Sequence, residues 1–178
     1  MDHADHVALI RSQIRDVPDF PRPGILFRDI TTVLRDAAAW RTTVELLRDA
    51  VQPWEPDVVA GIESRGFILG AALAYDLGLG FVPIRKPGKL PWDVHSVAYD
   101  LEYGSDALEI HTDAIGPGHR VVVVDDLLAT GGTVSAAISL VHSCGGEVAG
   151  VALLIELLGL GGRRRLPDDT PVTALLSY

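Results

Sequence analysis

Two adjacent carboxylates, Asp125 and Asp126, stand before a turn of small residues in this 178-residue chain. Four valines at 121–124 precede them and predict a short strand that is buried on both faces and ends at the acids. The segment 134–141 after the turn reads as a helix. N–H groups at the start of a helix bind anions, and carboxylates bind hydroxyl groups or a hydrated cation. The stretch therefore predicts a phosphate cradle beside two acids.

A simpler interpretation stays open for the same residues. Asp126 and Thr130 would then only favour the following helix, and the glycines would only turn the chain. A capping turn needs one polar residue, whereas this stretch has two acids and the run Thr-Gly-Gly-Thr. It lacks the Gly-Lys-Ser/Thr of a P-loop and the Gly-x-Gly-x-x-Gly of a dinucleotide-binding turn.

Two further loops carry cations. The run 63–66 (Glu-Ser-Arg-Gly) follows an apolar segment at 57–62, and the run 85–89 (Arg-Lys-Pro-Gly-Lys) follows another at 81–84. Both apolar segments are typical of strands, and the β–α–β alternation around them predicts a parallel sheet. Ligands bind at the carboxyl ends of parallel strands. We therefore expect these loops and the acid pair to form one site.

The elements that position these loops alternate along the chain. We predict helices at 4–16, 36–51, 67–77 and 134–141, and strands at 57–62, 81–84, 121–124, 147–155 and 172–176, the last at the edge. Residues 99–103 and 107–110 alternate polar and apolar side chains, which predicts a hairpin. Residues 92–98 have no clear period and are expected as a mobile lid loop. A single α/β domain over 1–178 is expected at this length.

Charge and composition disfavour several classes of partner. The net charge of −9 argues against nucleic acid and anionic membranes. No apolar run reaches the roughly 20 residues that span a bilayer. The single cysteine, Cys144, fits a reducing compartment, so a cytoplasmic protein is expected. The arginines at 163–165 follow two glycines and are expected as a solvated turn.

The acid pair and the turn at 129–133 resemble the phosphoribosyl diphosphate (PRPP) motif of type I phosphoribosyltransferases. Four more stretches, at 20–30, 63–67, 85–91 and 101–104, are similar, in the same order, to the adenine phosphoribosyltransferase family. The resemblance implies an α/β type I phosphoribosyltransferase fold with a mostly parallel five-stranded sheet flanked by helices. It also implies a small N-terminal hood within 1–35 and a lid loop and hairpin at 85–110. The implied reaction converts adenine and PRPP into AMP and diphosphate with Mg²⁺, in a homodimer.

The resemblance also implies roles for single residues. Glu102 would be the acid that protonates the purine, and Arg65 would act on the leaving diphosphate. The residues that would bind adenine are Leu26 through its backbone, Phe27 by stacking, Arg28 and Leu127. The catalytic and PRPP-binding residues would be Glu63, Ser64, Arg65, Arg85 (across the dimer interface), Lys86, Lys89, Asp125, Asp126, Ala129, Thr130, Gly131, Gly132 and Thr133. Mg²⁺ would be held through diphosphate and waters, with Asp125 and Asp126 as further ligands. A non-proline cis peptide is expected between Glu63 and Ser64.

Three alternatives stay open. The base could instead be hypoxanthine, guanine, xanthine or orotate, because one sequence does not fix the contacts to the base. The chain could be a non-catalytic PRPP sensor, although a sensor would normally carry a DNA-binding module. Glu102 could serve only as a salt-bridge partner in the hairpin.

Overall fold

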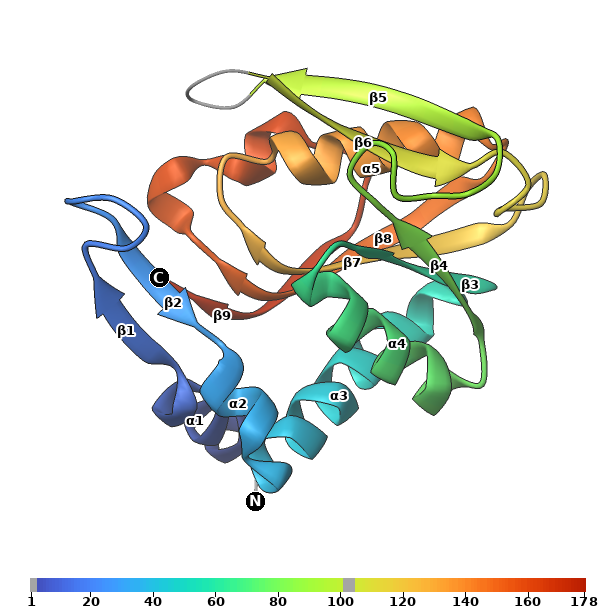
Figure 1. Ribbon diagram of the computed structural model, residues 1–178. Coiled ribbons are helices and arrows are strands. Elements are labelled where there is room, and N and C mark those ends of the chain that lie inside the picture. Colours follow the sequence, from blue (N-terminus) through green and yellow to red (C-terminus); the bar gives the residue numbers. More distant parts are fainter. Residues whose placement is uncertain (1–2, 101–104) are drawn as a thin grey trace. The chain divides into compact units, whose positions relative to one another are not determined.

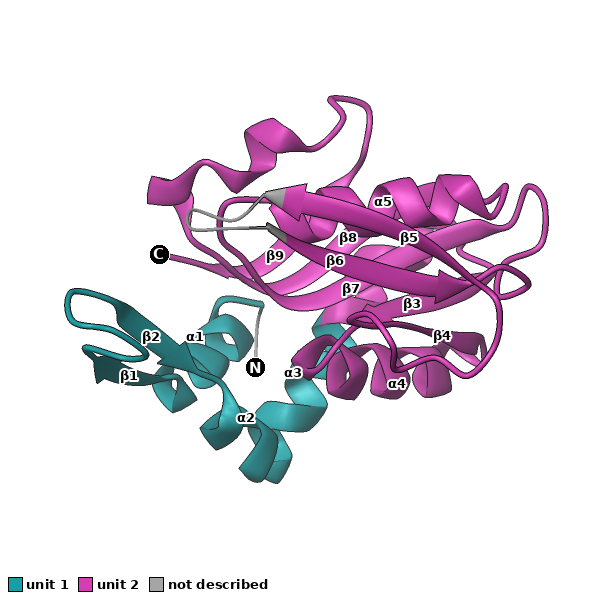
Figure 2. Ribbon diagram, turned by 45° about the horizontal axis from the view of Figure 1, so that its top comes forward, with its two compact units in different colours: residues 1–46 teal, residues 47–178 magenta. Residues whose placement is uncertain are grey.

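A computed structural model describes residues 3–100 and 105–178 of the chain. It divides into two compact units, residues 1–46 and residues 47–178, drawn in teal and magenta in Figure 2. Figure 1 labels the elements of both units. The sheet and its flanking helices belong to the second unit, and a small antiparallel ribbon belongs to the first.

The first unit is built around that two-stranded ribbon. Its elements are α1 (His3–Gln13), β1 (Arg15–Pro18), β2 (Leu26–Asp29), α2 (Thr31–Arg35) and the beginning of α3 (Ala37–Val51), which continues into the second unit. The prediction of a helix as far as residue 16 was wrong. Arg15 pairs with Asp29 across the ribbon at 2.5 Å, and Asp16 pairs with Arg28, so these two positions are held in a strand.

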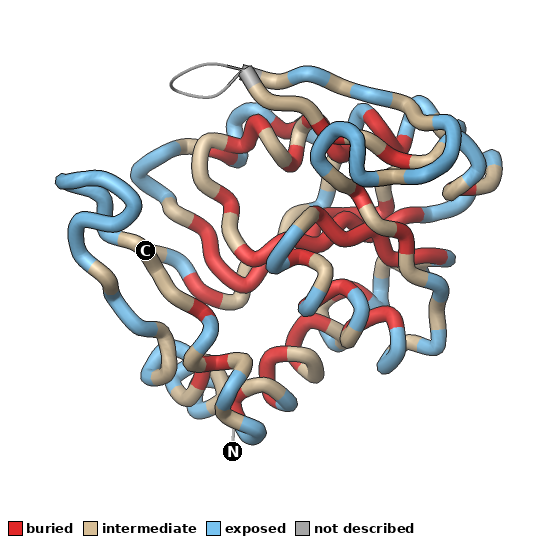
Figure 3. The backbone as a smooth tube through the Cα atoms, in the orientation of Figure 1, coloured by how far each residue is buried: buried red, intermediate tan, exposed pale blue. Residues whose placement is uncertain are grey.

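The second unit contains a five-stranded parallel sheet, as predicted. After a short 3₁₀ turn, η1 (Gln52–Trp54), its strands are β3 (Val58–Ile62), β4 (Gly80–Ile84), β7 (Arg120–Leu128), β8 (Glu147–Glu156) and β9 (Val172–Ser177). Their order is β4-β3-β7-β8-β9, and every neighbouring pair is parallel. The valines at 121–124 are fully buried in the central strand, which lies in the red interior of Figure 3. Pro83 lies on the edge strand β4, where a missing N–H costs least.

Two helices cover opposite faces of this sheet. The crossover from β3 through α4 (Arg65–Leu77) leads to β4 on one side, and the crossover from β7 through α5 (Gly132–Ser143) leads to β8 on the other. Right-handed crossovers in opposite directions place their helices on opposite faces. Figure 1 shows α4 and α5 on the two sides of the sheet. The chain then forms the short turns η2 (Leu158–Leu160) and η3 (Gly162–Arg165) before β9.

A hairpin of β5 (Val94–Asp100) and β6 (Ser105–His111) packs on α5. The hairpin was predicted, but the loop assigned to 92–98 was wrong beyond Asp93. His95 pairs with Ile110 and Val97 with Leu108, and Val97 packs against the buried core. These long-range pairings leave no local period in the sequence. Residues 101–104, and with them Glu102, lie outside the described residues.

The central strand β7 also runs further than predicted. The valines indicated an end at residue 124, yet pairing with β8 continues through Asp125 opposite Leu153 and Leu127 opposite Ile155, as far as Leu128. The apolar run of β8 therefore extends the ladder past two acids that strand propensity alone would place in a loop. As a result both carboxylates are fixed on a strand.

Candidate active site

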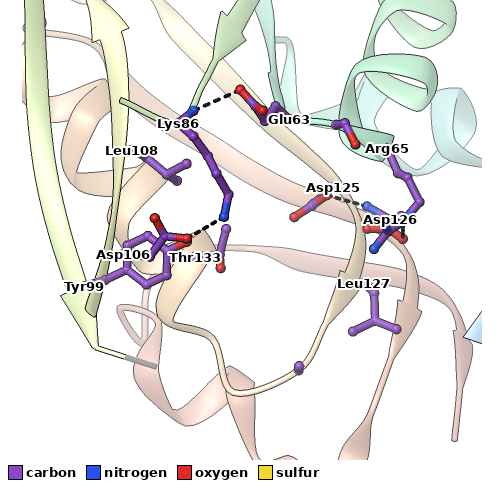
Figure 4. Close-up of a pocket in the computed structure, with 12 residues that line it drawn as sticks. Glu63, Arg65, Lys86, Tyr99, Asp106, Leu108, Asp125, Asp126, Leu127 and Thr133 are labelled. Atoms are coloured by element: carbon purple, nitrogen blue, oxygen red, sulfur yellow. Dashed lines mark hydrogen bonds and ion pairs between the residues drawn. The ribbon is translucent and has the colours of Figure 1, made fainter. Parts of the chain in front are cut away.

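A cavity of about 470 Å³ opens where β4, β3 and β7 end side by side. Its lining comes from the loop after β3, the loop after β4, the end of β7 and the hairpin (Figure 4). The lining residues are Glu63, Ser64, Arg65, Lys86, Tyr99, Asp106, Leu108, Asp125, Asp126, Leu127, Ala129 and Thr133. The three loops that were expected to form one site therefore do meet.

The two acids of β7 are both nearly buried, with Asp125 9% and Asp126 5% exposed. The backbone N–H of Asp126 donates to Asp125 Oδ1 at 2.8 Å, and Arg65 Nε donates to Asp126 Oδ2. Burial raises the pKa of Asp125 well above its ordinary value, and the neighbouring charge of Asp126 raises it further. Ionising Asp125 is therefore costly unless a ligand compensates its charge.

Gly66 explains why the loop after β3 comes so close to the acids. A Cβ atom at Gly66 would lie 2.6 Å from the carbonyl oxygen of Val124 and 3.0 Å from Asp125 Oδ1. Only glycine allows α4 to begin against β7 at that distance. This close approach brings Arg65 beside Asp126. The peptide bond between Glu63 and Ser64 is cis, as the resemblance implied.

Glu63 organises the cations after β4. Its Oε2 accepts from the backbone N–H of Lys86 at 2.9 Å and from Arg85 Nε at 3.2 Å, and its Oε1 accepts from Lys89 Nζ. The Glu63 side chain is only 9% exposed. Burial opposes its ionisation, but the Lys89 ammonium, the Lys86 N–H and the Arg85 guanidinium outweigh this, and the pKa of Glu63 is lowered.

Lys86 connects these cations to the hairpin. Its Nζ lies 2.5 Å from Asp106 Oδ2, which also accepts from the Tyr99 hydroxyl at 3.4 Å. Figure 4 shows the Lys86 side chain crossing the cavity from the Glu63 end to Asp106. The bond to Asp106 raises the pKa of Lys86, and the same bond lowers the pKa of Asp106. Sequence reasoning missed Tyr99 and Asp106 as cavity residues. Their facing positions in the hairpin were the available signal.

The glycine turn closes the cavity at the start of α5. Ala129 and Thr133 line the cavity, while Gly132 borders a second cavity of about 290 Å³, which Tyr99 also lines. Gly131 has a φ of +85°, which favours glycine. Among the described residues assigned to PRPP, those outside the lining of the larger cavity are Arg85, Lys89, Thr130, Gly131 and Gly132.

The residues expected to contact the base are divided between the two units. Leu127 lines the cavity of the second unit. In the first unit, Leu26, Phe27 and Arg28 lie on β2, where Leu26 is 47% exposed and Arg28 pairs with Asp16. The Phe27 ring packs edge-on against Phe20 at 5.1 Å between centroids. Within residues 3–100 and 105–178, no group of three or more His, Cys, Asp or Glu side chains has the arrangement of a metal site.

Comparisons with known proteins agree with this geometry. The sequence model of the phosphoribosyl transferase domain family matches residues 32–177. A curated adenine phosphoribosyltransferase from Synechococcus sp. is 62% identical over 169 residues, which are 95% of this chain and 98% of that protein.

Solved structures give the same result. The crystal structure of adenine phosphoribosyltransferase from Thermoanaerobacter pseudethanolicus has a TM-score of 0.94 at 51% identity, covering 97% of this chain and 99% of the other. The Saccharomyces cerevisiae enzyme, in complex with an imino-altritol bisphosphate and adenine, has a TM-score of 0.91 at 38% identity, with coverage of 97% and 99%. On the strength of its cavity, its parallel sheet and these matches, the chain belongs to the adenine phosphoribosyltransferase family.

Proposed function

We propose that this protein is an enzyme of purine salvage that transfers the 5-phosphoribosyl group of PRPP to adenine, giving AMP and diphosphate. One observation carries the proposal: an acid pair, the two ends of the turn at a helix start (Ala129 and Thr133) and the cations Arg65 and Lys86 border a single cavity. A ribose that bears phosphate groups at both ends needs all three features.

The turn at 129–133 would bind the 5-phosphate through backbone N–H groups and the hydroxyls of Thr130 and Thr133. Asp125 and Asp126 would accept hydrogen bonds from the ribose hydroxyls. Breaking the bond from C1 to diphosphate leaves positive charge on the sugar and negative charge on the leaving group. The acids of β7 would stabilise the sugar, and Arg65 and Lys86 would stabilise the diphosphate.

The cations near the cavity are held by carboxylates before substrate arrives. Arg65 pairs with Asp126, Lys86 pairs with Asp106, and Lys89 pairs with Glu63. The phosphate oxygens of PRPP would take over from these carboxylates as partners. With such an exchange, each cation is paired with a carboxylate in the absence of substrate and with a phosphate oxygen in its presence. The cations can therefore bind an anion although the chain has a net charge of −9.

Leu127 would contact adenine in the cavity of the second unit, and separate roles in binding the base are proposed for Leu26, Phe27 and Arg28 of β2. The backbone of Leu26 would read the amino group and N1, and Phe27 would stack on the ring. The complex of the yeast relative with adenine supports a site for this base in the family. Glu102 would protonate the purine as the new bond forms.

A Mg²⁺ ion fits the oxygen atoms that the cavity offers. Asp125 and Asp126 supply hard carboxylate ligands, and two acids suit an ion that keeps waters and substrate phosphates as its other ligands. When bound, Mg²⁺ neutralises charge on the leaving diphosphate.

The protein would act as a cytoplasmic homodimer, with Arg85 reaching the site of the partner subunit. The outer face of α4 supports an interface, because Ile68 and Tyr75 lie two turns apart on it and are 46% and 90% exposed. No helix among residues 3–100 and 105–178 has the length and apolar character needed to cross a membrane.

The proposal is tested by incubating purified protein with PRPP, Mg²⁺ and each of adenine, hypoxanthine, guanine and orotate while measuring diphosphate release. Adenine should give rapid release, and the other bases should give little. Release with another base alone would reassign the substrate. Thermal stabilisation by PRPP without release on any base would assign the chain as a sensor.

A further inference from the structure

The phosphate turn rests against a second turn that lies about thirty residues further along the chain. A Cβ atom at Gly131 would lie 2.3 Å from the carbonyl oxygen of Gly162 and 3.2 Å from Arg165 Cβ. A Cβ atom at Gly162 would lie 2.3 Å from the carbonyl oxygen of Ala129. Both glycines are buried, and the closest contacts are to backbone atoms, which no side-chain rotation can relieve. The backbone of Gly162 therefore packs directly against the turn at 129–133 and limits the conformations that the turn can adopt.

An ion pair between Arg163 and Glu156 fixes the position of Gly162. Arg163 donates from Nε to Glu156 Oε1 at 3.0 Å and from Nη2 to Glu156 Oε2 at 2.5 Å. Its Nη1 donates to the carbonyl oxygen of Val172 at 2.9 Å. The two-pronged contact with Glu156 and the third bond to the start of β9 leave the guanidinium one orientation. Residues 163–165 are exposed in a 3₁₀ turn, in agreement with the expected solvated turn, but Arg163 also forms this ion pair, which the sequence did not indicate.

Glu156 ties this ion pair to the strand that carries the turn. Glu156 ends β8 and pairs in register with Leu128, the residue directly before Ala129. Its side chain is only 10% exposed, and the pair with Glu156 raises the pKa of Arg163. The phosphate turn is thus held at its start by strand pairing with β8 and along its backbone by contact with Gly162. Glu156 takes part in both, because it ends β8 and binds Arg163, the residue after Gly162.

We propose that Gly162 and the Glu156–Arg163 pair are positioning residues for the phosphate turn, and that they set its affinity for the 5-phosphate end of the substrate. This role rests on the proposed function, because it assigns that phosphate to residues 129–133. Backbone N–H groups bind an anion only when several point at it together. A small shift of Ala129 or Gly131 would therefore weaken the 5-phosphate contact and leave the diphosphate contacts intact.

The test measures binding of two probes, ribose 5-phosphate and inorganic diphosphate, by calorimetry, together with the Tm of each variant. Gly162→Ala should weaken ribose 5-phosphate binding by about tenfold or more, since small misplacements in a site are costly. Diphosphate binding should stay within about twofold, because its contacts lie apart from the turn. Gly159→Ala is the matched control, because a Cβ atom at Gly159 would meet nothing within 4 Å.

Arg163 gives a second test that places no new atom in the turn. Arg163→Gln should weaken ribose 5-phosphate binding selectively, and Arg163→Lys, which keeps the charge, should restore part of it. Arg164→Gln removes the same charge from the neighbouring exposed residue and should bind both probes like the wild type. If Gly162→Ala does not fold, the Arg163 series decides the question.

Two results would overturn the inference. One is ribose 5-phosphate binding at wild-type strength in Gly162→Ala and Arg163→Gln. The other is an equal loss of both probes that follows a fall in Tm, which would mean a merely structural role. The proposed function fails separately. If the wild type binds ribose 5-phosphate but forms no AMP, the positioning role stands without the reaction.

Discussion

The Lys86 ammonium nitrogen lies 2.5 Å from Asp106 Oδ2 and so links the loop after β4 to the β5–β6 hairpin across the cavity. Lys86 is also a proposed diphosphate ligand. In the protein without substrate, its positive charge is therefore engaged by an acid that the substrate must replace. The pair is half-exposed on the lysine side, where the side chain is 49% accessible, so its own contribution to folding is small.

We expect Asp106→Asn to bind inorganic diphosphate more tightly, because Lys86 no longer has a carboxylate as a competing partner. The gain should be about two- to fivefold, the range of a partly exposed ion pair. Titration calorimetry measures the affinity. Asp168 is an exposed acid outside the cavity, so Asp168→Asn is the control for the change in net charge. Weaker diphosphate binding in Asp106→Asn would contradict the competition between Asp106 and the substrate.

Asp125→Asn should separate stability from activity. The pKa of Asp125 is raised in the folded protein above the ordinary value of 3.8, so the folded state binds more protons than the unfolded state between these two values. Stability is therefore lost as the pH rises through this window, so the ionisable carboxyl group of Asp125 destabilises the fold once the pH exceeds the unfolded value. Removing the charge should raise the Tm at pH 7 by a few degrees.

In the same variant, turnover of PRPP should fall by about ten- to hundredfold, because a hydrogen bond to a charged group is lost. Melting curves and initial rates on one preparation check both effects. A Tm and an activity that fall together would favour the interpretation in which the acids only support the fold.

Glu63 should contribute to the pH dependence of stability on the acid side. Its pKa is lowered from 4.5 in the folded protein, so its contribution is complete above pH 4.5 and is lost as the pH falls through the lowered value. Glu63→Gln should have a lower Tm at pH 7, because Lys89, Arg85 and the Lys86 N–H lose a charged acceptor. Its Tm should also fall less than that of the wild type between pH 5 and pH 3, a window in which about three quarters of a model carboxyl group titrates. Parallel Tm curves for the two proteins over this range would contradict the assignment.

Removal of divalent cations should stop turnover. We expect excess EDTA to abolish AMP formation and added Mg²⁺ to restore it, because the charge of the leaving diphosphate would otherwise be incompletely neutralised. The melting temperature in EDTA without substrate should stay unchanged, since most ligands of the ion would come from substrate and water. Undiminished turnover in EDTA would contradict the requirement for Mg²⁺.

Much of this arrangement could be predicted from local patterns. The run of valines at 121–124 predicted the central strand, and glycine and charged residues after three strands predicted loops that meet at one edge of the sheet. Local patterns failed where pairing over long distances decides the structure. Asp125 and Asp126 stay in β7 because β8 pairs with Asp125 and with the residues after Asp126. Val97 joins the hairpin because Leu108 faces it.

The ion pairs within the site were also beyond the sequence pattern. No residue next to Arg163 in the sequence indicates that it pairs with Glu156, and no residue next to Lys86 indicates that it pairs with Asp106. The purine-protonating role of Glu102 and the role of residues 1–35 as a hood stay predictions.

The most direct test of the central claim is the stoichiometry of the reaction with isotopically labelled adenine, PRPP and Mg²⁺. We expect one molecule of labelled AMP for each molecule of diphosphate released, and we expect Arg65→Gln to slow both by about a hundredfold without unfolding. Diphosphate release without labelled AMP, or an Arg65→Gln protein as fast as the wild type, would contradict the claim.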